Sequence, residues 1–253
     1  MTRALWLELL LVTAVAAAAV AAIPLQAGVW GWSWDALNHH IYLGLVSESP
    51  RWHLDVLAAS GQGWQYPYLY WPVYRLAELP IDGATAGAIW GALLVALLVP
   101  PLWLLSLRLL PQQGKAGQAI FERSAAVALG LSSVVVLQAL GTTANDPLAA
   151  VPLLWAVAIM AAPQASDRRA AMAAALWGMA VAFKLTALLA APLLLVWWWR
   201  RQPVAAQLRR GLVMVAAAAL GYTLTHAPWG WQLWQHYGNP VFPLLHGWFG
   251  AEP

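Results

Sequence analysis

The run ALWLELLLVTAVAAAAVAAI, residues 4–23, decides the fold class of this chain. It is apolar over about 20 residues, the length that a helix needs to cross the hydrocarbon core of a bilayer. Further apolar runs follow. The whole chain is 62% hydrophobic and 9% charged, whereas soluble domains average about 25% charged residues. The sequence therefore predicts an all-α, polytopic membrane protein.

A cleaved signal peptide is the alternative for this first run. Arg3 would be its basic start, and the small residues near Val20-Ala21-Ala22 would form its cleavage site. The apolar core of a signal peptide is about 7–15 residues long. Because this run is longer, an uncleaved transmembrane helix is favoured.

Composition also excludes several classes of function. The chain has no cysteine, so disulfides, thiolate metal sites and cysteine nucleophiles are excluded. It contains no nucleotide-binding loop, HExxH zinc motif or GxSxG elbow. The net charge of +3 does not indicate nucleic-acid binding, because in a membrane protein the positions of the basic residues matter more than their sum.

We predict one membrane domain over residues 1–253, with about seven transmembrane helices and a long outer loop after the first. The helices span about 4–26, 84–107, 124–140, 148–162, 170–182, 186–199 and 211–225, and the loop spans about 27–82. The apolar stretch 170–199 is divided into two short helices because both its flanks are basic, and Lys and Arg favour the cytoplasmic side. This division places Lys184 at the outer membrane surface.

Charge placement predicts the orientation. Most of the 13 Lys and Arg residues fall in predicted cytoplasmic segments: Arg3, Arg108, Lys115, Arg123, Arg168, Arg169, Arg200, Arg201, Arg209 and Arg210. All six His and most acidic residues fall in predicted outer segments. We therefore expect a cytoplasmic N-terminus and an active face on the periplasmic side of a bacterial inner membrane.

The stretch WDALNHHIY, residues 34–42, is the main candidate site. In a helix, Asp35, Asn38, His39 and Tyr42 share one face. Asp35 could act as a general base for an acceptor, or it could be a carboxylate that only stabilises a helix start. Adjacent His39 and His40 point about 100° apart and are poor ligands for one metal, and His40 is expected at the surface or interface.

An aromatic segment, residues 61–72, lies in the same outer loop. Its Trp and Tyr residues could anchor the protein at the membrane interface. Alternatively, residues such as Gln65 and Tyr66 could form a platform for a sugar ring or a prenyl chain. Arg75 follows and could pair with a phosphate.

Two further outer positions could carry charge into a site. Asp146, in Asn145-Asp146-Pro147, could be an ordinary helix-entry residue. Alternatively, it could form a two-carboxylate site with Asp35, or it could bind a divalent cation through oxygen ligands. Lys184 interrupts an apolar stretch, where it either snorkels to the surface or binds a lipid phosphate. His226, at the start of the outer tail, completes the candidate substrate-binding residues.

The pattern resembles the GT-C superfamily of integral membrane glycosyltransferases. Four segments carry the resemblance: residues 34–42 with Asp35, residues 144–147 with Asp146, the Gly-x-x-x-x-Phe-Lys-Leu-Thr segment 178–186, and the Gly-Asn-Pro-x-Phe-Pro segment 238–243. Many members have two adjacent acids after the first helix, whereas here Ala36 follows Asp35. Members are usually much longer, so the resemblance implies an N-terminal part of a longer protein or a minimal relative.

The resemblance implies a function and a set of roles. Enzymes of this superfamily transfer a sugar from a polyprenyl-phosphate donor at the outer membrane face, here to an envelope acceptor that is a lipid, a glycan or a protein. Asp35 matches the catalytic acidic position that activates the acceptor, and Asp146 matches the second one. Lys184 and Arg75 would neutralise the phosphate of the donor.

Three other interpretations compete with this one. A lipid-phosphate binder without catalysis would use Lys184 and Arg75 but would not need Asp35, and an inactive fragment would need none of the three. A transporter would place ionisable residues at mid-membrane depth in repeated halves, and the sequence contains no internal repeat.

Overall fold

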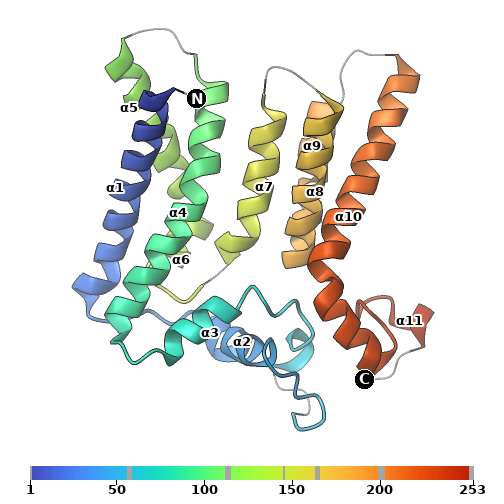
Figure 1. Ribbon diagram of the computed structural model, residues 1–253. Helices are drawn as coiled ribbons and strands as arrows, with labels where there is room; N and C mark the ends of the chain where they lie inside the picture. The colour runs from blue at the N-terminus through green and yellow to red at the C-terminus, as the bar shows by residue number, and fades with distance from the viewer. Residues whose placement is uncertain are drawn as a thin grey trace.

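The computed structural model describes residues 2–55, 59–111, 115–144, 146–162, 166–198 and 203–250. Long helices stand side by side, and a layer of short helices and loops, which we call the outer layer, lies across one end of them (Figure 1). No β-strand occurs among the described residues; Gly31 and Thr142 form an isolated parallel bridge. The prediction of an all-helical protein is confirmed.

The long helices come from six parts of the chain. They are α1 (Arg3–Ala27), α4 (Gly83–Leu109), α5 (Ala116–Leu131), α7 (Asp146–Met160), α8 (Asp167–Phe183) and α10 (Val204–Tyr237). The shorter elements are the π-helix η1 (Ala36–His40), α2 (Ile41–Val46), the 3₁₀ helix η2 (Ser60–Gln62), α3 (Trp71–Glu78), α6 (Val134–Ala139), the 3₁₀ helix η3 (Leu185–Ala190), α9 (Ala191–Trp198) and α11 (His246–Phe249).

Three helices in the described part of the chain are long and apolar enough to cross a membrane: α1, α4 and α10. Their apolar side chains face outward in large part, as with Leu11 (65% exposed) on α1 and Leu212 (73% exposed) on α10. Exposed apolar surface of this extent needs lipid or a partner to cover it. The prediction of a membrane protein is supported to that extent.

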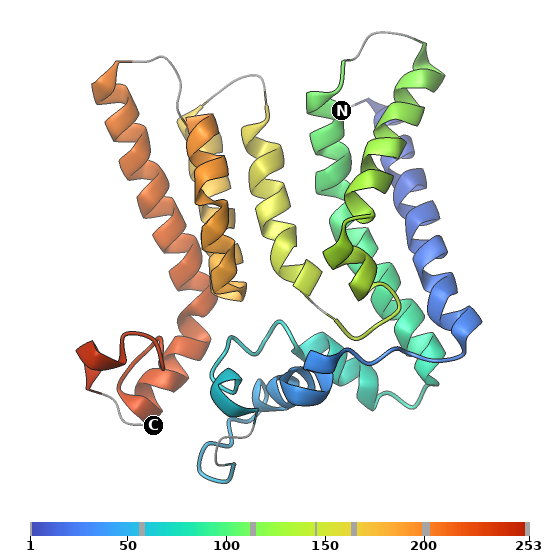
Figure 2. The ribbon, with the colours of Figure 1, turned by 180° about the vertical axis from the view of Figure 1, so that it is seen from behind.

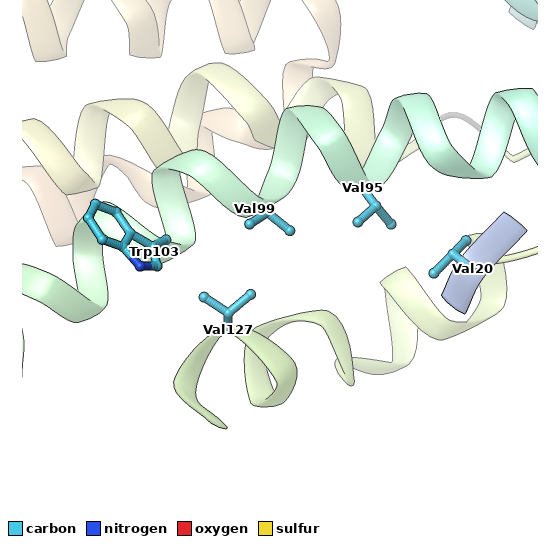
Figure 3. Packing of buried hydrophobic residues seen from close by; sticks show 5 residues of the cluster. All are labelled: Val20, Val95, Val99, Trp103 and Val127. Atoms are coloured by element: carbon cyan, nitrogen blue, oxygen red, sulfur yellow. The ribbon is translucent and has the colours of Figure 1, made fainter. Parts of the chain in front are cut away.

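The first helices pack around a buried apolar cluster. Val20 of α1 lies beside Val95 of α4 at one end of the cluster, Trp103 of α4 lies at the other end, and Val99 of α4 and Val127 of α5 lie between them (Figure 3). Glu8 on α1 accepts hydrogen bonds from Trp103 at 2.9 Å and from Arg123 at 2.6 Å, and both charged side chains are less than 10% exposed. This buried ion pair ties α1 to α5.

The ion pair corrects the sequence analysis at one position. Arg123 was assigned to a basic cytoplasmic loop, but α5 begins at Ala116 and carries Arg123 inward to Glu8. A charge taken out of water needs a partner of opposite sign, and Glu8 supplies it from within the first apolar run.

Several predicted helix boundaries differ from the observed ones, among them the starts of α5 and α10, which begin at Ala116 and Val204 instead of about 124 and 211. The stretch 124–140 is divided at Ser132-Ser133 into α5 and α6. The last helix, predicted to end at 225, continues to Tyr237 because Trp229 and Leu233 are buried against the outer layer. The outer segment 27–82 is not one loop, since it contains η1, α2, η2 and α3.

The helix ends divide into two sets (Figures 1 and 2). The start of α1, the end of α4 and the starts of α5, α8 and α10 lie at one end of the molecule. The outer layer, the start of α7 and the end of α8 lie at the other. Arg200 and Arg201, which the orientation prediction also used, are outside the described residues.

Candidate functional site

The candidate site lies where the helices meet the outer layer. Asp146 opens α7, and Lys184 occupies the break between α8 and η3 with an extended backbone (φ −151°, ψ 117°). The Lys184 ammonium pairs with the Asp146 carboxylate. This break is at the position where the sequence suggested it, and it presents a cation at the outer end of α8. Asn145 lies outside the described residues.

A π-helix turns two adjacent histidines into the same interior. In η1 each turn holds one residue more than in an α-helix, which changes the face that each residue occupies. His39 and His40 are therefore both buried, 5% and 3% exposed, with their ring centroids 4.4 Å apart. The expectation that His40 lies at the surface was wrong. The expectation that Asp35 and His39 share one α-helical face was also wrong, because Asp35 is exposed whereas His39 is buried.

Charged neighbours act on this histidine pair. Burial lowers the pKa of His39, while the negative charges of Asp35 and Asp146 oppose that shift and the Lys184 charge adds to it. Burial, together with the neighbouring His39, lowers the pKa of His40 to about 4. Both imidazoles are therefore neutral at pH 7.

Tyr70 connects the histidine pair to the next part of the site. Its ring lies 4.5 Å from that of His40, and its hydroxyl donates to Gln65 Oε1 at 3.3 Å. Burial raises the pKa of Tyr70 well above its usual range, helped by the charges of Asp146 and Asp35. The sequence analysis singled out the aromatic segment but did not single out Tyr70.

Asp35 differs from the other carboxylates of the described residues. Each of the others accepts a hydrogen bond or forms an ion pair: Glu8, Glu48, Asp55, Glu78, Asp82, Glu122, Asp146 and Asp167. Asp35 has neither with any described residue, and its side chain does not cap η1. An exposed carboxylate without a partner is available to a ligand.

Four of the predicted substrate-binding residues line one cavity of about 350 Å³, which we call the aromatic cavity. They are Gln65, Tyr66, Lys184 and His226, and its wall also includes Phe183, Tyr222 and Phe242. Tyr66 packs on Phe183 with ring centroids 5.6 Å apart, and Tyr222 stacks on His226 at 5.2 Å. This volume is within the range of small-molecule sites. Among the described residues of the lining, Lys184 is the one Lys or Arg side chain.

The Gly-Asn-Pro-x-Phe-Pro segment forms one wall of this cavity. Asn239 is fully buried, donates to the Leu244 carbonyl at 2.7 Å and accepts from the Val241 amide at 3.0 Å. His226 Nε2 lies 2.9 Å from the Pro240 carbonyl oxygen. In the sequence this segment is only one of the four that carry the superfamily resemblance; the structure shows that it contributes Phe242 to the wall of the cavity.

Three predicted site residues are engaged elsewhere. The hydroxyl of Tyr42 donates to Asp55 at 3.3 Å, and Asn38 donates to the Trp34 carbonyl at 2.8 Å. Arg75 pairs with both Glu48 and Glu78. None of the three lines the aromatic cavity.

Comparisons with protein-family models, with curated protein sequences and with solved structures find no match for this chain. The chemistry of the site therefore rests on the residues described above.

A divalent cation would need several ligands at one point. Within the described ranges, no group of three or more His, Asp or Glu side chains could hold a metal ion. The Asp146 carboxylate is paired with Lys184, so the residues present do not form a metal site.

Proposed function

We propose that this chain is a membrane glycosyltransferase that moves a sugar from a polyprenyl-phosphate donor to an envelope acceptor. One observation carries the proposal. Lys184 lies in the wall of the aromatic cavity, pairs with Asp146, and lies close enough to the histidine pair to act on its protonation together with Asp35. A cation and an aromatic platform thus occur in one cavity. Asp35, an available carboxylate, does not line that cavity, but its charge acts on the same histidine as the charge of Lys184.

The donor would bind through Lys184 and the aromatic cavity. A phosphate group at the mouth of the cavity would share the Lys184 ammonium with Asp146. Tyr66 and Phe183 would contact the sugar or the first prenyl units through their rings. The neutral histidine pair adds no second cation, so Lys184 determines where the phosphate lies.

Asp35 would act on the acceptor. In the proposed step, an acceptor hydroxyl oxygen forms a bond to the anomeric carbon while the bond from that carbon to the phosphate oxygen breaks. The electron pair of the broken bond stays on polyprenyl phosphate, next to Lys184. The hydroxyl proton passes to the Asp35 carboxylate and then to solvent.

The proposal includes a topology. The chain would cross a bacterial inner membrane seven times, through α1, α4, α5–α6, α7, α8, η3–α9 and α10. The N-terminus would be cytoplasmic, and the site would face the periplasm. The apolar stretches of α7 and η3–α9 are shorter than those of α1, α4 and α10, so the membrane would be thin around the site or the helix ends would be covered by the outer layer.

A lipid-phosphate binder without catalysis is the second candidate, because the aromatic cavity and Lys184 do not include Asp35. The two candidates differ in what Asp35→Asn does. We expect the purified variant to bind polyprenyl phosphate as tightly as the native chain and to release none from sugar-loaded donors. Equal binding by the native chain and the variant, with no release by either, would leave the binder as the better account, and release by the variant at the native rate would exclude Asp35 from catalysis.

Lys184 is tested by donor binding. Lys184→Met removes a charge-assisted contact and should weaken polyprenyl-phosphate binding about tenfold or more, and Lys184→Arg should retain most of it. Thermal stability should change little, because the Lys184–Asp146 pair is 44% and 33% exposed and such pairs contribute about 0–1 kcal/mol. Equal binding by native and Lys184→Met chains would exclude Lys184 as the phosphate ligand.

A further inference from the structure

A second cavity, which we call the amide cavity, lies between the outer segment and the outer end of α10. It has a volume of about 350 Å³ and is lined by Pro50, Trp52, Gln232, Gln235 and His236. It shares no lining residue with the aromatic cavity. The end of α10 that carries it lies on the same side of the molecule as the outer layer (Figure 1).

The lining of the amide cavity indicates a neutral ligand. Among the described residues that line it there is no carboxylate, Lys or Arg, so these residues would balance the charge of neither a phosphate nor a metal cation. Two glutamine amides each offer both donors and acceptors. Hydroxyl groups, which donate and accept at the same oxygen, match that combination.

One of these amides has an unused acceptor. Gln232 Nε2 donates to the Tyr68 hydroxyl at 3.2 Å, which fixes the direction of the amide. Its Oε1 is buried and has no hydrogen-bond partner among the described residues. Leaving such an oxygen unpaired costs about 1–3 kcal/mol. A ligand hydroxyl would remove that cost once the amide turns outward, because the oxygen is covered in this structure.

Trp52 provides an aromatic surface beside the amides. Its ring is held by Trp229 at 5.2 Å, His236 at 5.0 Å and Tyr237 at 5.5 Å between centroids. A ring fixed in this way loses little conformational entropy when a ligand packs on it. An aromatic ring next to hydrogen-bonding amides suits a sugar, which has C–H faces and a rim of hydroxyls.

We propose that the amide cavity binds a neutral saccharide, and that this saccharide is part of the acceptor. The second half of this statement rests on the proposed glycosyltransferase function. Gln232 bonds to Tyr68, and Tyr68 packs on Tyr66 at 5.4 Å, which lines the aromatic cavity. An acceptor glycan held in the amide cavity would therefore lie near the proposed donor site, with Tyr68 and Tyr66 between the two.

The binding half is tested without any transfer. The purified chain in phosphatidylcholine nanodiscs is mixed with the methyl glycosides of glucose, galactose, mannose and N-acetylglucosamine, and saturation-transfer NMR measures binding. We expect at least one glycoside to bind, and Gln232→Leu or Gln235→Ala to weaken that binding about tenfold. Gln235 is exposed, so its replacement does not put folding at risk. Gln207→Leu, on the opposite end of the same helix, is the matched control and should bind as the native chain does.

The outcomes separate this inference from the proposed function. Absence of binding by all four glycosides, or equal binding by the native chain and the Gln235→Ala variant, overturns the saccharide site whatever the transfer assay gives. Where transfer is measured, Gln235→Ala should raise the acceptor KM about tenfold and leave kcat unchanged, and an unchanged KM overturns the acceptor role. Asp35→Asn should leave glycoside binding intact, so the saccharide site would still be detected if the proposed catalysis were lost.

Discussion

At the scale of single residues, the site is defined by which charges have partners. Arg75 is neutralised by Glu48 and Glu78, and Lys184 has only Asp146 among the ion pairs of the described residues. Asp35 has none. A ligand that brings a phosphate and a hydroxyl to this site would therefore meet one cation with a single counterion and one available carboxylate.

The histidine pair predicts a pH dependence of stability. An unfolded chain takes up a proton on His40 near pH 6.5, whereas the folded chain does so only near pH 4. Between these values the unfolded state binds more protons, so stability falls as the pH falls, by about 3 kcal/mol over the whole interval. Stability should be nearly constant above pH 7, where both states are neutral at this residue.

Thermal unfolding in detergent between pH 7.5 and pH 4.5 measures this effect. His40→Gln should flatten the loss of Tm towards low pH, while His53→Gln, at an exposed position, should keep the native slope. Identical slopes for the native chain and the His40→Gln variant would contradict the assignment of a buried, neutral His40.

Sequence patterns predict some of these residues better than others. Asp146, Lys184 and His226 are found by residue type and by their place at the outer ends of apolar runs, and Gln65 and Tyr66 are found by their place in the aromatic segment 61–72. The burial of His40 is missed because the π-helix changes the face of the residues after Asp35, and no periodicity in residues 34–42 marks that change. Tyr70 is missed because its role depends on its contact with His40, which is distant in sequence.

At the scale of elements, α8 and α10 pack with their backbones in close contact. A Cβ atom on Gly178 would lie 2.0 Å from the Ala218 carbonyl oxygen, and one on Gly221 would lie 2.1 Å from that of Ala175. Small residues let two helix backbones approach in this way within a membrane. This contact sets the distance between α8 and α10, and it thereby sets the position of Lys184 relative to His226.

Gly178→Ala should therefore separate the two helices and destabilise the protein by about 1–3 kcal/mol, seen as a lower Tm. Gly117→Ala is the matched control, because nothing lies within 4 Å of a Cβ at that position on α5. Alanine there should be neutral or stabilising by up to about 1 kcal/mol. A Tm for Gly178→Ala at or above that of Gly117→Ala would contradict the close contact.

Elements were predictable where length and hydropathy decide them. The apolar runs identify α1 and α4, and basic flanks identify the break between α8 and η3. The extension of α10 past residue 225 was not predictable in the same way. Pro228 and several polar residues suggest an end, yet burial of Trp229 and Leu233 keeps the segment helical.

At the scale of the whole molecule, the account predicts which connections face each side of the membrane. The chain contains no cysteine, so single cysteines can be introduced without a background. Ser49, in the outer layer, and Ser166, before α8, are both exposed. In intact cells with a permeabilised outer membrane, an impermeant maleimide should label Ser49→Cys at once and Ser166→Cys only after the inner membrane is opened. Labelling of both from the same side would contradict the seven-crossing topology.

The central claim is that Asp35 serves sugar transfer from a polyprenyl-phosphate donor. The most direct measurement is the transfer of radiolabelled sugar from membrane polyprenyl-phosphate donors to envelope material, in cells that express the native chain, Asp35→Asn or Asp82→Asn at matched levels. Asp82 caps α4 through Thr85, and asparagine caps helices as well as aspartate does, so this variant controls for the loss of an outer carboxylate. The account predicts native transfer by Asp82→Asn and a loss of at least about a hundredfold in Asp35→Asn. Equal transfer by both variants, or no transfer above background by the native chain, would contradict it.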